Sequence, residues 1–305
     1  MKYRKVVIMG KKRRINKKRI TGFLFLIPAM VFILYATVIP FVWNFFLSFQ
    51  KWDGFGEITF RGIQNYITVF QDTAIFKSVG NSVYYALAST IGGLVVGILL
   101  ATLVFQLSGK EGSFFRLILF SPAMLPIAVV GLMFTFFYNP EMGLLNNFLK
   151  LIGLESLQHV WLQNQNTAML CIIFVAVWKC AGQVMLLCFA SMQTIPESLY
   201  ESSKLDGAGY WKQIRYITLP LIKPMILLAA INTLGTQYKS YDLIFTMTQG
   251  GPGDLTTTVP IRMTKMAFSY GKFGESAAAG VVFTVVVVAS ILIVKRLLRG
   301  EEYEF

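Results

Sequence analysis

Six long apolar segments constrain the fold of this chain more than any other feature of its sequence. An α-helix needs roughly 20 apolar residues to cross a hydrocarbon layer of about 30 Å. The segments lie near Ile20–Phe49, Ser78–Leu107, Phe114–Tyr138, Thr167–Gln193, Leu221–Met247 and Ser276–Leu298. Charged residues make up only 14% of the chain, whereas roughly 25% is typical of a soluble domain. The sequence therefore predicts an all-α polytopic membrane protein with six transmembrane helices.

Four prolines fall inside these predicted spans, namely Pro28, Pro40, Pro122 and Pro126. Neighbouring helices in a membrane bundle can tolerate them, because other groups satisfy the backbone atoms that a proline frees. We therefore expect each apolar segment to cross the membrane as one span.

Positive charge is concentrated at the N-terminus, where the first twenty residues contain ten Lys and Arg and no acid. Loops rich in Lys and Arg usually remain in the cytoplasm, and an even number of spans places both termini on the same side. We therefore predict a cell-membrane (plasma or inner membrane) protein with both termini in the cytoplasm. The net charge of +13 then reflects topology and contact with anionic lipid in the bilayer. Nucleic-acid binding is disfavoured, because no recognition module accompanies the basic residues.

Sequence motifs of the common enzyme classes are missing. The chain has no G-x-x-x-x-G-K-[ST] loop, so it should not hydrolyse ATP itself, and neither H-E-x-x-H nor G-x-S-x-G occurs. The cysteines, Cys171, Cys180 and Cys188, all lie in the fourth span and fit no metal motif, which indicates small buried apolar residues. The single histidine, His159, lies in a predicted outer loop. We predict no catalytic, metal or cofactor site.

A polar segment, residues 195–224, separates the fourth and fifth apolar segments. The Pro-Glu pair at 196–197 favours a helix start, because the missing proline N–H would be unpaired there and a carboxylate stabilises the positive end of the helix. Gly207 and Gly209 predict the end of that helix, since glycine readily adopts positive φ. A second helix over residues 210–218, closed by the following Leu-Pro pair, would complete an L-shaped cytoplasmic knob.

Three motifs in this segment resemble the cytoplasmic signature of ABC importer permeases, which reads E-A-A, a following G, and I-x-L-P. They are Glu201-Ser202-Ser203, Asp206-Gly207-Ala208 and Ile217-Thr218-Leu219-Pro220, with a Ser-Ser pair in place of Ala-Ala. Tyr241–Gly253, Phe60–Tyr66 and Asn81 resemble segments of the carbohydrate-importing branch. From about residue 20 to 298, the chain is similar to permease subunits of the maltose and multiple-sugar type.

The resemblance implies the type I importer permease fold, in which residues 195–220 form a coupling loop with a coupling helix. A second homologous permease would complete the pathway, and two ABC ATPase subunits using ATP and Mg²⁺ would drive it. An extracytoplasmic solute-binding protein would deliver the carbohydrate substrate. The implied ATPase-coupling residues are Glu201, Ser202, Ser203, Asp206, Gly207 and Ala208. Among them, Glu201 would make a polar contact with the ATPase and Gly207 would keep the bend.

The predicted organisation has four parts. Residues 1–19 form a basic cytoplasmic tail, and residues 20–77 form the first transmembrane helix with an outer loop. Residues 78–298 form a five-helix permease core that contains the coupling loop 195–220, and residues 299–305 form a cytoplasmic tail. In the last of the outer loops, Gly250–Gly253 should make a tight turn.

Polar side chains on the fourth and fifth spans are candidates for the substrate path. They are Trp178, Lys179 and Gln183 on the fourth span, and Asn232, Gln237, Lys239, Ser240 and Asp242 on the fifth. In such permeases this part of the fifth span lines the cavity, which favours Gln237 and Ser240. Two alternatives stay open. Lys239 and Asp242, one helical turn apart, could pair with each other, and the polar groups could simply hydrogen-bond between helices.

The leading function is therefore the permease subunit of an ATP-driven importer of a sugar or oligosaccharide. Import of another polar solute, such as glycerol phosphate, is an alternative within transport. A membrane scaffold or sensor that transports nothing is an alternative from another class. An ion-coupled carrier is disfavoured, because such carriers often need a chain of buried carboxylates and Asp242 is the one deep candidate in the predicted spans.

Overall fold

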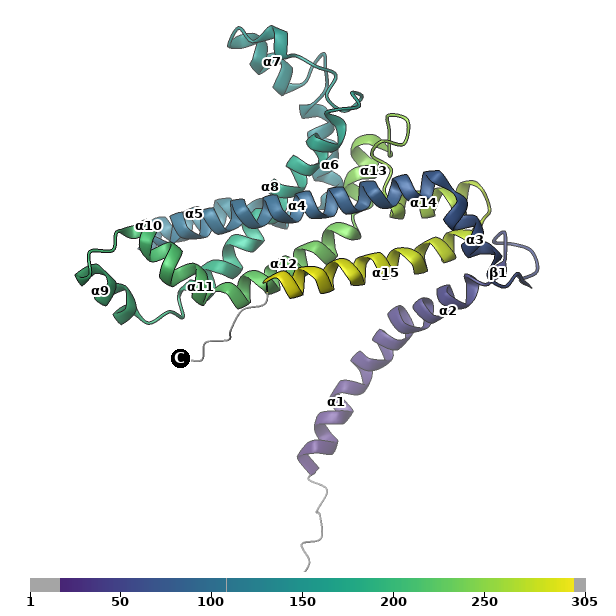
Figure 1. Ribbon diagram of the computed structural model, residues 1–305, viewed down its shortest axis with the longest axis horizontal. Coiled ribbons are helices and arrows are strands. Elements are labelled where there is room, and N and C mark those ends of the chain that lie inside the picture. The colour runs from purple at the N-terminus through teal and green to yellow at the C-terminus, as the bar shows by residue number, and fades with distance from the viewer. Residues whose placement is uncertain (1–16, 108, 299–305) are drawn as a thin grey trace, which may run out of the picture.

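The computed structural model describes residues 17–107 and 109–298 as a bundle of helices with one short hairpin (Figure 1). Within these residues, four helices are long and apolar enough to span a membrane, and counting each of two bent helix pairs as one span raises the number to six. This confirms the predicted all-helical fold. The predicted tail 299–305, and all but the last three residues of the tail 1–19, lie outside the described residues.

The four unbroken spans are Leu24–Leu47, α4 (Thr73–Phe105), α8 (Ala168–Met192) and α15 (Phe273–Leu298). The first of these spans consists of most of α1 (Lys17–Ile33), a π-helical turn (Leu34–Val38) and α2 (Ile39–Leu47). One bent pair is α5 (Gly109–Met124) with α6 (Ile127–Phe137). The other joins α10 (Tyr210–Gln213), a π-helical turn (Ile214–Thr218) and α11 (Leu219–Leu221) to α12 (Lys223–Tyr238). The shorter helices are α3 (Gln64–Gln71), α7 (Leu144–Leu151), a 3₁₀ turn (Glu155–Leu157), α9 (Glu197–Leu205), α13 (Asp242–Thr248), α14 (Val259–Thr264) and a π-helical turn (Lys265–Ser269). Strands β1 (Gln50–Lys51) and β2 (Thr59–Phe60) pair antiparallel.

Two of the π-helical turns lie directly before prolines. The Ile39 N–H donates to the Leu34 carbonyl, five residues back, immediately before Pro40. The ring of a proline clashes with the carbonyl four residues earlier, so a wider turn lets the helix continue. The first span is therefore continuous in spite of its prolines, as predicted.

The helix predicted over residues 210–218 continues further than expected. A π-helical turn again precedes Pro220, with Leu219 N–H donating to the Ile214 carbonyl, and the helix runs on to Leu221. The predicted end at the Leu-Pro pair is therefore wrong. The chain instead bends by 69° between Leu221 and Lys223.

The third and fifth predicted spans are each interrupted by a break in the helix. Helices α5 and α6 meet at 94° across Leu125–Pro126. Proline cannot donate a backbone hydrogen bond and pushes the preceding residue out of helical conformation. In the fifth segment α12 ends at Tyr238 and α13 starts at Asp242. Neither proline nor glycine lies at this second break, so hydropathy alone could not locate it.

Small residues allow α4 and α8 to make the most extensive helix contact of the bundle. Gly93 and Gly97 on α4 are buried against α8. A Cβ built on Gly93 would overlap Cys180, and one on Gly97 would lie 2.6 Å from Val184 Cβ and 2.8 Å from the Ala181 carbonyl. Gly93 and Gly97 have the G-x-x-x-G spacing that permits close backbone approach in membranes. The cysteines fit this packing, since Cys171 and Cys188 are buried and all three are free thiols.

We expect Gly97→Ala to destabilise the bundle, because the added methyl group meets α8 backbone and side-chain atoms at less than contact distance. Gly80→Ala is the matched control, since a Cβ at Gly80, also on α4, meets nothing within 4 Å. Replacing an unhindered helical glycine by alanine stabilises a helix by roughly 0.5–1 kcal/mol. Thermal unfolding of the purified protein should show a lower Tm for Gly97→Ala alone, and equal Tm values for the two variants would contradict this packing.

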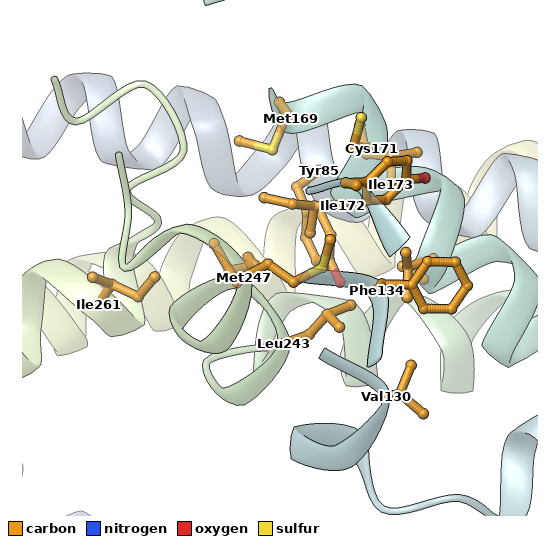
Figure 2. Close-up of a cluster of buried hydrophobic side chains, with 14 residues drawn as sticks. Tyr85, Val130, Phe134, Met169, Cys171, Ile172, Ile173, Leu243, Met247 and Ile261 are labelled. Carbon is orange, nitrogen blue, oxygen red and sulfur yellow. The ribbon is translucent and has the colours of Figure 1, made fainter. Parts of the chain in front are cut away.

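The buried apolar cluster in Figure 2 brings together five helices that are distant in sequence. Tyr85 comes from α4, Val130 and Phe134 from α6, and Leu243 from α13, while Ile172 and Ile261 come from α8 and α14. The broken pieces α6 and α13 therefore pack against each other, α13 also packs on α8, and Phe134 of α6 contacts Trp178 of α8. This cluster lies between two hollows, one near the start of α6 and α13 and one near their ends.

The motif Phe60–Tyr66 connects the first span to the last. Asn65 Nδ2 donates to the carbonyls of Ser48 and Gln50 at 2.9 and 2.8 Å. Arg61 Nη1 lies 3.1 Å from Glu275 Oε1, at the start of α15. The motif thus fixes the hairpin end of α2 to α15, at the end of the bundle opposite α9 (Figure 1).

Candidate functional site

The predicted knob has the expected shape of a helix, a glycine break and a second helix. Helix α9 ends at Leu205, and Gly207 adopts φ = +76°. The Gly207 N–H donates to the Lys204 carbonyl at 3.0 Å and the Ala208 N–H to the Ser203 carbonyl at 2.9 Å, the hydrogen bonds of a Schellman motif. Gly207 therefore ends the helix for the predicted reason.

Gly209 plays a different part from the predicted one. Its φ is −71°, an ordinary value, and it is the N-cap residue of α10. A Cβ at either Gly207 or Gly209 would meet nothing within 4 Å. Only Gly207 is therefore required to be glycine, and for its backbone conformation alone.

Hydrogen bonds fasten the knob to the membrane helices. Tyr200 on α9 shares a 3.0 Å hydrogen bond with Thr218 in the π-helical turn, and the Tyr210 hydroxyl donates to the Thr102 carbonyl on α4. Burial raises the pKa of Tyr200, and the hydrogen bond to Thr218 lowers it by less, so both phenols are neutral at physiological pH. The knob is thus tied directly to α4 and, through residues 214–218, to α12.

The predicted coupling residues lie on and just beyond α9, and most of them are exposed. Glu201, Ser202 and Asp206 are exposed. Ser203 faces inward, where its hydroxyl accepts a 2.9 Å hydrogen bond from Gln213 Nε2. Glu201 lines a hollow of about 680 Å³ between α9, α10 and the ends of α4 and α8. Leu205, the residue before Asp206 at the C-terminal tip of α9, is 90% exposed, although it was not among the predicted coupling residues.

A cavity of about 260 Å³ lies where α12 stops and α13 begins. Its polar lining comes from α4, α8, α12, the break at residues 239–241 and the start of α13, and includes Tyr85, Lys179, Gln183, Thr236, Gln237, Lys239, Ser240 and Asp242. Six of the eight substrate-path candidates therefore surround one cavity, namely Lys179, Gln183, Gln237, Lys239, Ser240 and Asp242, whereas Trp178 and Asn232 do not line it. Their contact with a substrate stays a prediction.

Tyr85 organises this cavity, although it was not among the candidates. Its hydroxyl lies 3.0 Å from Gln237 Oε1 and 3.1 Å from Ser240 Oγ. Tyr85 and Gln237 are 1% and 7% exposed, so these hydrogen bonds satisfy groups that water reaches poorly. From the sequence, a tyrosine in an apolar segment is interpreted as a core residue. Only the tertiary structure places the Tyr85 hydroxyl beside α12.

Two candidates differ from expectation. Trp178 does not line the cavity; it packs on Phe134 with the ring centroids 5.4 Å apart. Lys239 and Asp242 are not one turn apart on a single helix, since Lys239 caps the end of α12 and Asp242 begins α13. No ion pair joins them among the described residues. The alternative in which they simply pair is therefore not seen.

The predicted turn at Gly250–Gly253 is present just after the C-terminal end of α13. Gly250 and Gly253 have positive φ, and the Gly251 N–H donates to the Thr248 carbonyl at 2.9 Å. Asn81, one of the residues that resemble the carbohydrate-importing branch, has a structural role here. Its Nδ2 donates to the carbonyls of Asp254 and Thr257 at 3.2 and 3.0 Å. The start of α4 thus holds this turn in position.

An ion pair strengthens the same attachment. Arg262, buried on α14, lies 2.7 Å from Asp254. Burial alone would raise the pKa of Asp254, but hydrogen bonds from Arg262 and Thr257, with the charges of Arg262 and Lys265, hold it below the ordinary value of an aspartate. Such a carboxylate stabilises the fold above its unfolded-state pKa, and this contribution disappears as pH falls through the lower folded-state value.

We expect Asp254→Asn to speed hydrogen exchange of amides 250–257 at pH 7, because the ion pair is then lost. The extra loosening that the wild type undergoes at acidic pH, when this carboxylate is protonated, should be missing in this variant. Asp53→Asn is the control, since within the described part of the chain Asp53 accepts hydrogen bonds only from its neighbours Phe55 and Gly56. Equal exchange at residues 250–257 in wild type and Asp254→Asn at pH 7 would show that the ion pair does not hold the turn.

Comparison with known proteins agrees with this architecture. Residues 93–300 match the family described as the binding-protein-dependent transport system inner membrane component. The chain is 38% identical to the probable ABC transporter permease protein YurN of Bacillus subtilis over 291 residues, which cover 94% of this chain and 99% of YurN. It is 32% identical to the sulfoquinovosyl glycerol transport system permease protein SmoG of Agrobacterium fabrum, over 93% of this chain and 92% of SmoG.

The fold also matches a solved structure, a chain of a bacterial ABC transporter involved in the import of alginate. The TM-score is 0.80 at 24% sequence identity, over 93% of this chain and 96% of that chain. At this identity the match concerns the fold, which is that of a type I importer permease. The chain therefore belongs to the inner-membrane permease components of binding-protein-dependent ABC transport systems, of the carbohydrate-uptake type, and is not itself the ATPase.

Proposed function

We propose that this permease imports a sugar or short oligosaccharide and forms one half of its translocation pathway. The observation that carries the proposal is the cavity at the α12–α13 break, where uncharged donors and acceptors converge. Gln183, Gln237, Ser240 and Tyr85 offer amide and hydroxyl groups, which are the partners that sugar hydroxyls require. A second permease facing this one would complete the pathway.

The charges around the cavity support an uncharged solute over a phosphate ester. The Lys179 ammonium donates to three backbone carbonyls, so its hydrogen-bonding capacity is already used. The other two charged groups in the lining, Lys239 and Asp242, carry one charge of each sign. A strongly anionic solute such as glycerol phosphate would need several cations with free N–H donors, and we therefore rank it second.

The knob supplies the proposed joint with the ATPases. Helix α9 presents Glu201 and the exposed Leu205 at the end of the molecule opposite the β1–β2 hairpin (Figure 1). We expect each of two ATPase subunits to receive such a knob, one from each permease, and their use of ATP and Mg²⁺ to move the knobs together. The ties from Tyr200 to Thr218 and from Tyr210 to α4 would transmit that movement to the helices around the cavity.

Uptake by a strain that lacks this gene tests the proposal. We expect loss of uptake for one of a panel of labelled neutral sugars, with restoration by the intact gene but not when the partner ATPase is inactivated. A defect confined to glycerol phosphate would favour the second candidate. Unchanged uptake of every solute would favour a scaffold, and uptake that survives ATPase loss but stops with an ionophore would favour an ion-coupled carrier.

A further inference from the structure

The break between α5 and α6 removes the usual donors for several backbone carbonyls. Pro122 cannot donate to the Ile118 carbonyl, and Pro126 cannot donate to that of Pro122. The Ser121 hydroxyl donates to the Ile118 carbonyl at 2.8 Å and so replaces the first missing hydrogen bond. The Pro122 carbonyl receives a 3.3 Å hydrogen bond from Leu125 N–H. Because unpaired carbonyls are costly inside a membrane, the last turn of α5 needs a further donor.

Lys179, on α8, is that donor. Its Nζ lies 3.2 Å from the Pro122 carbonyl, 3.3 Å from that of Ala123 and 2.6 Å from that of Leu125. An ammonium group carries three N–H donors, and a cation is favoured at the negative end of a helix dipole. The side chain therefore caps α5 at the residue where the chain turns.

The backbones of α8 and α5 also meet one turn further along α8, at Gly182. A Cβ there would overlap the Leu119 carbonyl and lie 2.9 Å from Phe120 Cα, so the close approach depends on glycine. Lys179 and Gly182 are three residues apart and share a helix face. Helix α8 thus holds α5 at two points just before the bend, one by backbone contact and one by charge.

We propose that Lys179 is a positioning residue that fixes the α5–α6 bend and, through it, one wall of the solute cavity. Lys179 itself lines that cavity together with Gln183 and Ile127, the first residue of α6. Beyond the bend, α6 packs against α13. Loss of the cap should let α6 move relative to α5 and shift both broken spans. The role in transport rests on the proposed function, whereas the role in holding the bend does not.

Distance measurement across the bend tests this assignment in the assembled transporter, reconstituted in nanodiscs. Spin labels at exposed Leu117 on α5 and Leu132 on α6, with the native cysteines replaced by alanine, report the angle without any solute. We expect Lys179→Met to broaden the distance distribution and move it to longer values as the bend relaxes. Lys179→Arg keeps the charge and the donors, and should retain the wild-type distribution.

Gln183→Leu is the matched control, because Gln183 lines the same cavity from the same helix and has no hydrogen bond to α5 among the described residues. It should leave the distance unchanged even if uptake falls. In Lys179→Met, uptake should lose more in maximal rate than in apparent affinity. A wild-type distance distribution in Lys179→Met would overturn the proposal, whatever happens to uptake. If that variant does not assemble, Lys179→Gln, which is too short to reach the three carbonyls, should broaden the distribution, and an unchanged distribution would again overturn it.

Discussion

Gly207→Val should reduce transport by at least about tenfold while leaving the transporter assembled in the membrane. A non-glycine residue in the left-handed region costs roughly 1–2 kcal/mol, and a β-branched side chain is especially unfavourable there. A penalty of about 1.4 kcal/mol shifts an equilibrium about tenfold. Since a Cβ at Gly207 would meet nothing within 4 Å, the penalty falls on the bend alone. Uptake and solute-stimulated ATPase activity, measured on the same membranes, should both fall.

Gly209→Val is the matched control for this prediction. It adds the same side chain two residues away, also into open space, where φ is −71° and valine is allowed. Transport should remain close to the wild-type rate. If Gly207→Val transports as well as Gly209→Val, the bend after α9 does not couple the permease to its ATPase.

Gln237→Leu should raise the apparent KM for the imported sugar about tenfold. The substitution removes an amide from the cavity wall and leaves Tyr85 with Ser240 as its hydrogen-bond partner. Removing one partner from a poorly hydrated site costs about 1–3 kcal/mol, which corresponds to roughly one to two powers of ten in affinity. Initial rates of uptake over a range of sugar concentrations, with saturating binding protein, would measure the change.

Thr236→Val tests whether that effect is specific to the amide. Thr236 lines the same cavity, but its hydroxyl already donates to the Asn232 carbonyl at 2.9 Å within α12. Valine has nearly the same shape, so KM should change little. Equal KM values for Gln237→Leu and wild type would remove Gln237 from the substrate path, and an equally large rise in Thr236→Val would point to general disturbance of α12.

The shape of the coupling segment was predictable because its determinants are local. Hydrogen bonds from Gly207 and Ala208 reach back only three and five residues, and a glycine after a polar helix is a reliable sign of that motif. The helix end predicted at the Leu219–Pro220 pair was wrong for a local reason as well. A π-helical turn absorbs Pro220 and carries the helix on to Leu221, a solution that a proline rule does not anticipate.

The cavity was predictable only in part. Polar residues near the end of the fifth apolar segment stood out, and six of the eight candidates do lie together. Trp178 was misplaced because its side chain points toward Phe134 instead, and helix rotation is not visible in an apolar segment. Tyr85 and the capping role of Lys179 were missed for a related reason. Their partners lie 152 and 57 residues away along the chain, and no local pattern records such contacts.

The amino-acid sequence by itself determined the class of the protein, its apolar spans, the bent polar knob and the family to which it belongs. These features follow from hydropathy, from glycine conformation and from short motifs, which act within a few residues. Only the tertiary structure decided that spans three and five are broken, that Gly97 and Gly182 admit backbone contact, and that α8 caps the end of α5. A helix in a membrane can break only where other groups replace its lost backbone hydrogen bonds. Those groups are distant in the sequence, so it is the packing of the helices that brings them to the break.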